Sequence, residues 1–113
     1  MQIELARGDS CEKGFILKNG TTPSEDVFDE IYFTVKNTYT DKDFVLQKRL
    51  TEGGIIKDET AGHYTLYINP EDTNQLEFKD YDCDFEFVKT GGYKKTFYGK
   101  FRLTKEVTHQ INE

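Results

Sequence analysis

The stretch that decides the fold is NPEDTNQLEFKDYDCDFEFVKTGGYKKTFYGKFRL, which runs from Asn69 to Leu103. In its middle, aromatic and apolar residues alternate with acidic residues, and after a Thr-Gly-Gly sequence they alternate with polar and basic residues. Alternation with a period of two is the mark of a strand that buries one face. The expected inward residues are Tyr81, Cys83, Phe85 and Phe87, followed by Phe97, Phe101 and Leu103. The stretch therefore predicts an antiparallel hairpin with an aromatic inner face.

The register of this hairpin follows from the rule that directly paired residues share a face. A two-residue turn at Gly91-Gly92 would set Phe87 opposite Thr96, which places core against solvent. A loop of Thr90-Gly91-Gly92 pairs Phe85 with Phe97 and puts Gly92 where a positive φ is wanted. A loop one residue later would instead set Asp82 opposite Arg102. The turn residues favour the first register and the charges favour the second; we take the first.

The beginning of the stretch predicts one helical turn over residues 70–75. Asn69 suits the N-cap, Pro70 suits the first helical position, and the acids that follow suit the positive end of the helix dipole. Tyr81 stands two residues before Cys83, as in the tyrosine corner of immunoglobulin (Ig)-type domains. A plain core tyrosine is the other interpretation, and both stay open.

The rest of the chain continues the alternation, with turn residues between short strands. Strands are expected at 2–7, 14–19, 27–36, 44–50, 53–60, 63–69, 80–88 and 96–104. About seven or eight short strands with regular turns favour an all-β antiparallel sandwich. The 113 residues suffice for one domain of ordinary size. We place that domain at 1–108 and expect a frayed tail at 109–113.

Composition and charge exclude several classes of partner. The net charge of −6 argues against the phosphates of nucleic acid and against an anionic membrane surface. No basic segment followed by an apolar one marks a secretory signal. The two cysteines, Cys11 and Cys83, lack metal-binding spacing, and free thiols are favoured over a disulfide between them.

No residue pattern indicates catalysis, a cofactor or a metal site. His63 is expected to be solvated, and His109 lies in the tail. Ser10 and Ser24 have no motif of a nucleophile around them. The acidic residues from Asp80 to Glu86 are too far apart along one strand face to share one calcium ion. We therefore expect a protein that is not an enzyme.

Three tyrosines, Tyr32, Tyr67 and Tyr98, take the solvent side of their strands. Tyrosine is enriched at protein interfaces because it offers a large amphipathic area at low entropy cost. Strands also favour tyrosine on any half-exposed face. The three residues are the candidate interaction face, with an ordinary strand surface as the other interpretation.

Two segments carry a resemblance to a known family. They are Gly62–Thr73, GHYTLYINPEDT, and Gly99–Thr108, GKFRLTKEVT. With the early "GD" at Gly8-Asp9 and the strand ending in Lys36, their order resembles the small Ig-like domains of phage and prophage tail and baseplate proteins, such as the N-terminal domain of the baseplate upper protein. The glycine usual before the "YD" strand is absent, and Cys83 stands where an apolar residue is common.

This resemblance implies an Ig-like sandwich and a virion structural protein that acts through protein–protein contacts. Its expected partners are other phage structural proteins or further copies of the same chain, with no nucleic acid and no membrane. Its expected location is the bacterial cytoplasm during assembly and then the virion. The alternative is a carbohydrate-binding β-sandwich module whose exposed tyrosines stack on sugar rings.

Overall fold

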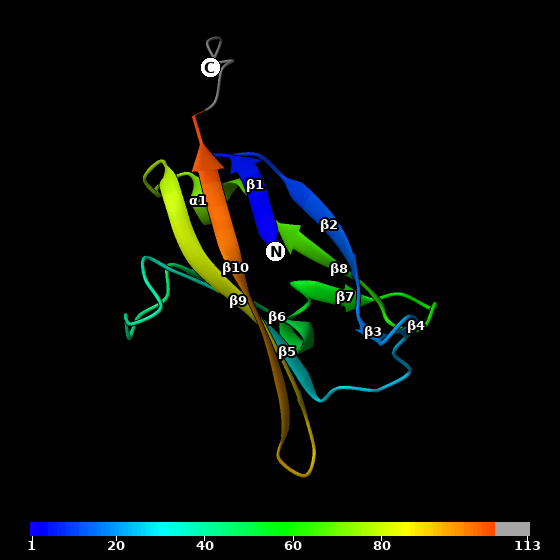
Figure 1. Ribbon diagram of the computed structural model, residues 1–113. Helices are drawn as coiled ribbons and strands as arrows, with labels where there is room; N and C mark the ends of the chain where they lie inside the picture. Colours follow the sequence, from blue (N-terminus) through cyan, green and yellow to red (C-terminus); the bar gives the residue numbers. More distant parts are fainter. Residues whose placement is uncertain (106–113) are drawn as a thin grey trace.

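A computed structural model describes residues 1–105, and nearly all of its regular elements are β-strands (Figure 1). Two short helices interrupt the strands: the 3₁₀ turn η1, Leu50–Glu52, and the α-helix α1, Pro70–Thr73. The strands are β1 Gln2–Ala6, β2 Cys11–Ile16, β3 Lys18–Asn19, β4 Thr22–Pro23, β5 Glu30–Lys36, β6 Leu46–Arg49, β7 Ile55–Lys57, β8 His63–Ile68, β9 Lys79–Lys89 and β10 Tyr93–Thr104. The all-β prediction is confirmed. The expected tail at 109–113, the end of the domain at 106–108 and His109 lie outside the described residues.

The strands form one large sheet and two smaller ones. The five-stranded sheet has the order β1-β10-β9-β5-β6, the three-stranded sheet has the order β2-β8-β7, and β3 pairs with β4. The expectation of purely antiparallel sheets is wrong at one edge, because β1 runs parallel to β10. These two strands come from opposite ends of the domain, so no tight hairpin forces them to be antiparallel.

The hairpin of β9 and β10 has the first of the two predicted registers. Phe85 pairs with Phe97, and Asp82 pairs with Lys100. Gly91 and Gly92 both have positive φ, 94° and 85°, a conformation that only glycine adopts at no steric cost. The turn residues therefore decided the register correctly.

Aromatic rings from the two larger sheets meet in one core. Phe15 of β2 lies 4.7 Å from the ring of Phe85 on β9, and Tyr64 of β8 lies 6.2 Å from that of Phe87. Phe33 on β5 is 4.8 Å from Phe85 and has no exposed surface. Rings at these separations add to the stabilisation that burial itself provides. The predicted inward residues of β9, Tyr81, Cys83, Phe85 and Phe87, are all buried.

The helical turn and Tyr81 are placed as the sequence indicated. Helix α1 ends at Thr73, two residues earlier than expected, and the Asp72 carboxylate accepts the N–H of Asn69 at 2.7 Å. Tyr81 is buried, and its hydroxyl donates to the Glu77 carbonyl at 2.8 Å. A hydrogen bond to the backbone a few residues upstream is the feature that defines a tyrosine corner. Tyr81 is therefore a core residue that also makes a hydrogen bond of this kind.

Several details differ from the sequence-based expectation. The second strand begins at Cys11 rather than at residue 14, and the fourth keeps only Leu46–Arg49 because the chain then turns into η1. The pair β3–β4 was not expected. Phe97 points inward, with its ring 5.8 Å from that of Phe87, but it remains 38% exposed because it lines an open apolar hollow.

Candidate functional site

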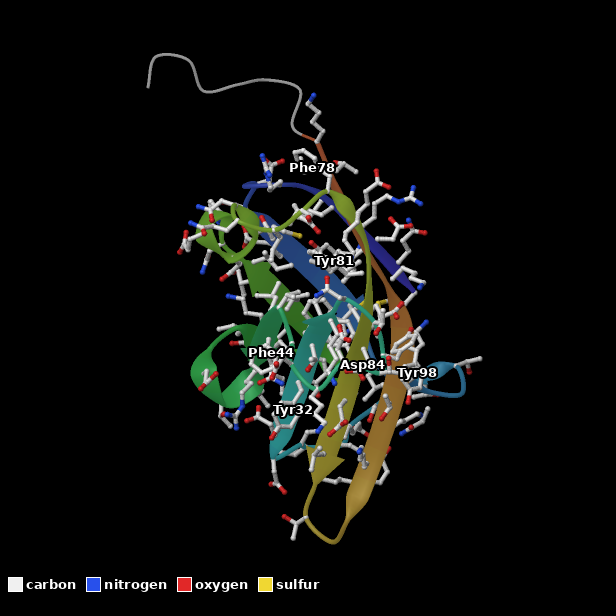
Figure 2. All side chains as sticks on the ribbon, turned by 90° about the vertical axis from the view of Figure 1, so that its left-hand side faces the viewer. Tyr32, Phe44, Phe78, Tyr81, Asp84 and Tyr98 are labelled. Carbon is white, nitrogen blue, oxygen red and sulfur yellow. The ribbon has the colours of Figure 1, made fainter. Side chains whose placement is uncertain are left out.

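The candidate site is the side of the five-stranded sheet that faces away from the core. We call it the outer face and define it by residues on β5, β9 and β10 and in the loop between β5 and β6. Figure 2 looks onto this face, with Asp84 near its centre. The defining residues are Tyr32, Thr34, Lys36, Tyr39, Phe44, Asp82, Asp84, Glu86, Tyr98 and Lys100.

Charged pairs cross from β9 to β10 on this face. Lys100 contacts the carboxylate of Asp82, and Arg102 donates to that of Asp80 at 2.8 Å. The hydrogen bond from Arg102 holds the pKa of Asp80 below its usual value. Because Asp80 and Arg102 are each about half exposed, their pairing stabilises the fold little. The acidic ladder on β9 is thus partly neutralised by a basic ladder on β10.

Three aromatic side chains stand out from the outer face. Tyr98 is 63% exposed, Phe44 is 51% exposed and Tyr39 is 47% exposed. The rings of Tyr39 and Tyr98 meet edge to face with their centroids 5.3 Å apart. The Tyr39 backbone N–H donates to Asp82 at 3.0 Å, and its hydroxyl donates to the Gly99 carbonyl at 3.2 Å. The loop thus holds Tyr39 against the sheet.

Tyr32 is also on the outer face, but its ring is covered. The Arg49 guanidinium lies 5.1 Å from the centre of that ring, close enough for a cation–π contact. Arg49 in turn donates to the carboxylate of Glu30 at 3.1 Å. Tyr32 is consequently half-buried, and Tyr98 is the more accessible of the two predicted tyrosines.

Asp84 lies in a shallow depression between these aromatic residues. Burial raises its pKa, and the neighbouring Glu86 raises it further. A hollow of about 350 Å³ extends from Asp84 and Glu86 to Tyr32 and Phe44. A second hollow of about 190 Å³ lies on the side of Tyr39 and Tyr98. The face therefore offers carboxylates, lysines and aromatic rings within one surface.

Tyr67 is not part of this surface. It lies on β8 of the three-stranded sheet, where it pairs with Glu12 of β2. The structure therefore brings together Tyr32 and Tyr98 and leaves Tyr67 on the other sheet. Tyr39 and Phe44 belong to the face and were not predicted, because both lie in a loop without alternation.

By alternation Glu30 belongs to the same side of its strand as Tyr32 and would face solvent, but it is buried, 7% exposed. Its carboxylate accepts hydrogen bonds from the backbone N–H groups of Ile31 and Thr51, both at 3.1 Å. Burial alone would raise its pKa, but the hydrogen bonds from Thr51, Ile31 and Arg49 outweigh burial and lower it. The ionised form is therefore the one that the fold favours.

Replacing Glu30 with glutamine is expected to lower the free energy of unfolding at pH 7 by about 1–3 kcal/mol, because charged hydrogen bonds are lost in a buried position. A carboxyl group whose pKa is lowered by folding contributes its full stabilisation of the folded state at pH values above its ordinary pKa, which is 4.5 for glutamate. This contribution is lost as the pH falls through the pKa that the group has in the folded state. Urea unfolding at several pH values should therefore show a steeper acid loss in the wild type than in Glu30→Gln.

The matched control for this prediction is Asp80→Asn, which removes an exposed carboxylate whose pKa is also lowered. Solvent screens this pair, so little change is expected. Equal acid sensitivity in wild type and Glu30→Gln would show that Glu30 does not contribute in this way.

The residues considered for chemistry are placed as follows. The Nδ1 atom of His63 is 2.9 Å from the Ala61 carbonyl, and Ser24 is buried with its hydroxyl accepting the Asp26 N–H. Cys11 and Cys83 are free thiols, and burial raises the pKa of Cys83 to about 12. Within residues 1–105, no three His, Cys, Asp or Glu side chains are grouped to hold a metal ion. In the same range, no helix is long and apolar enough to cross a membrane.

Comparison with known proteins adds no relative to this picture. No family model matches the chain, and no curated protein matches it.

Proposed function

We propose that the chain is an Ig-like β-sandwich. In Ig-type domains, the sheet that contains the last two strands packs against a sheet of three or four others, and a tyrosine corner precedes the penultimate strand's core residues. The order β10-β9-β5, the separate sheet β2-β8-β7 and the Tyr81 hydrogen bond support this assignment. The ring contacts between Phe15 and Phe85 support face-to-face packing of the two sheets.

We further propose that this domain is a non-enzymatic structural part of a phage or prophage tail or baseplate, and that it works through protein–protein contacts. The observation that carries the proposal is the exposure of Tyr98, Phe44 and Tyr39 together on the outer face. A tyrosine-rich surface on a rigid sheet loses little conformational entropy when a partner covers it. The charged pairs around these rings would form the polar rim that such contacts have.

The carbohydrate-binding alternative has one observation in its favour. The hollow beside Asp84 and Glu86 combines carboxylates with the aromatic rings of Tyr32 and Phe44, and polar groups between rings suit a sugar. However, the Arg49 guanidinium lies over the ring of Tyr32, so a sugar would have to displace it to stack there. The protein-contact proposal therefore explains more of this surface.

Self-association through the outer face is expected to weaken when its exposed rings are removed. We expect Tyr98→Ser and Phe44→Ser each to raise the dissociation constant at least about tenfold, which corresponds to about 1.4 kcal/mol. Multi-angle light scattering over a range of protein concentrations measures this change. The matched control is Tyr67→Ser, which removes the same side chain from the other sheet and should leave the mass unchanged.

Two other results would contradict the proposal that the outer face makes the protein contacts. If Tyr67→Ser alone dissociated the assembly, the interface would be on the three-stranded sheet. If a panel of soluble glycans raised the melting temperature and Phe44→Ser removed this rise, the carbohydrate alternative would replace the proposal. Ligand binding stabilises the folded state by mass action, so the melting temperature reports it directly.

A further inference from the structure

Half of β10 has a strand on one side only. Its pairing with β9 runs the full length of the strand, from Tyr93 to Leu103. Its pairing with β1 covers only Lys100 to Thr104, because β1 begins at Gln2. Figure 1 shows this arrangement: β1 begins about midway along β10, and the β9–β10 hairpin extends beyond that point in the other direction. Within residues 1–105, no strand pairs with the open side of Tyr93–Gly99.

The backbone of this segment offers hydrogen-bonding groups to the open side. The N–H of Lys100 donates to Met1 and the carbonyl of Thr104 accepts from Arg7, so the even-numbered residues of β10 point their backbone groups toward β1. Because backbone groups alternate in direction along a strand, Lys94, Thr96 and Tyr98 present theirs to the same side. Unpaired strand edges of this kind are templates for another strand.

An apolar hollow of about 350 Å³ lies beside the open edge. It lies between the end of β2 and the hairpin, and its lining includes Ile16, 47% exposed, and Phe97, 38% exposed. A strand added next to β10 in line with β1 would direct every second side chain toward this hollow. The site therefore has both the backbone edge and the side-chain space that strand addition requires.

Strand β1, which already pairs with β10, indicates which side-chain pattern an added strand should have. In β1, Ile3 and Leu5 enter the core while Glu4 stays outside, with a carboxylate oxygen 3.8 Å from Arg102. The open half of β10 also carries two lysines and no acidic residue. Lys94 points to the outer side, where its ammonium lies 3.4 Å from the Glu86 carboxylate, whereas Lys95 is on the same side as Phe97 and Lys18 lines the hollow. The Lys95 ammonium lies 5.3 Å from the centre of the Phe97 ring at this edge.

We propose that the open half of β10 binds an extended segment of a partner protein in which apolar residues alternate with acidic residues. Its backbone pairs with Lys94, Thr96 and Tyr98, its apolar side chains enter the hollow, and its carboxylates lie on the opposite side, beside Lys94. Pairing with the same edge of a second copy is disfavoured, because it would bring four lysines together. Lysines on edge strands generally prevent such edge-to-edge pairing. The two sites share Tyr98, but this one uses its backbone whereas the outer face uses its side chain, so either proposal can fail without the other.

The test is binding of a fluorescent peptide with the sequence Val-Glu-Ile-Glu-Val-Thr-Ile, acetylated and amidated, measured by fluorescence anisotropy. We expect a dissociation constant below about 1 mM for the wild type, and at least about tenfold weaker binding of the same peptide with lysine in place of glutamate. The variant Lys94→Glu should reverse this preference. The control Lys57→Glu, on the edge of the other sheet, should leave it unchanged.

A second variant tests the backbone contact. Thr96→Pro removes an N–H that points to the open side and leaves the pairing with β9, as proline does on edge strands. It should abolish binding while circular dichroism stays that of the wild type. If Thr96→Pro does not fold, the charge variant decides. The proposal is overturned if the wild type does not bind the peptide, or if the charge variant binds both peptides as the wild type does.

Discussion

Replacing Phe85 with alanine is expected to lower the free energy of unfolding by about 3–5 kcal/mol, the usual cost of removing a buried phenylalanine ring. Phe85 is 6% exposed and lies at the centre of the core, 4.7 Å from the ring of Phe15 and 4.8 Å from that of Phe33. Its removal leaves a cavity between the two sheets that rigid strands cannot close. Since small domains are stable by only about 5–15 kcal/mol, urea unfolding should show a large shift of the midpoint.

The matched control is Phe97→Ala, because Phe97 is the direct partner of Phe85 across the hairpin. Phe97 is 38% exposed, so we expect it to cost less than half as much. Equal losses for the two variants would contradict the placement of the core between the sheets.

Replacing Gly62 with alanine is expected to lower the free energy of unfolding by about 2–4 kcal/mol. The φ of Gly62 is +75°, and an added Cβ would lie 2.6 Å from the Leu17 carbonyl oxygen and 3.0 Å from the Ser24 nitrogen. The left-handed conformation costs an alanine about 1–2 kcal/mol. Moving the neighbouring backbone would also weaken two hydrogen bonds of 2.8 Å, one from the Leu17 N–H to the Gly62 carbonyl and one from the Ser24 N–H to the Leu17 carbonyl. Each such bond contributes about 0.5–1.5 kcal/mol to stability.

Gly91→Ala separates these two causes. Gly91 also has a positive φ, 94°, but a Cβ built there meets no atom within 4 Å. Its substitution should therefore show the conformational cost alone, measured by thermal unfolding under the same conditions. If Gly62→Ala were no more destabilising than Gly91→Ala, the close approach of Leu17 and Ser24 would have no energetic role.

The fold could be predicted from the sequence where alternation and turn residues agree. In β9, each inward residue from Tyr81 to Phe87 is preceded by an acid, and the glycines of the turn favour the register that the hairpin adopts. In the segment 44–50 the alternation is irregular, and only Leu46–Arg49 form a strand. The parallel pairing of β1 with β10 could not be predicted, because it depends on contacts between chain ends that no local pattern encodes.

The candidate site could be predicted only where it lies on strands. Tyr32 and Tyr98 take the solvent side of their strands and are on the outer face. Alternation does not say which sheet a strand joins, and Tyr67 lies on the three-stranded sheet. Tyr39 and Phe44 lie in a loop whose path is set by tertiary contacts, such as the hydrogen bond between the Tyr39 N–H and Asp82. Alternation places Glu30 on the solvent side of its strand, but the residue is buried because Arg49 and Thr51 fold over its carboxylate.

The central claim is that this domain is a virion part held in place by its outer face. The most direct measurement is quantitative mass spectrometry of phage particles purified from the bacterium that carries the gene, with wild-type protein or with Tyr98→Ser/Phe44→Ser. We expect the wild-type chain in the particles at a fixed ratio to the tail proteins, and the double variant to be lost from them while it still folds. Particles that lack the wild-type chain, or that retain the double variant at the same ratio, would contradict the account.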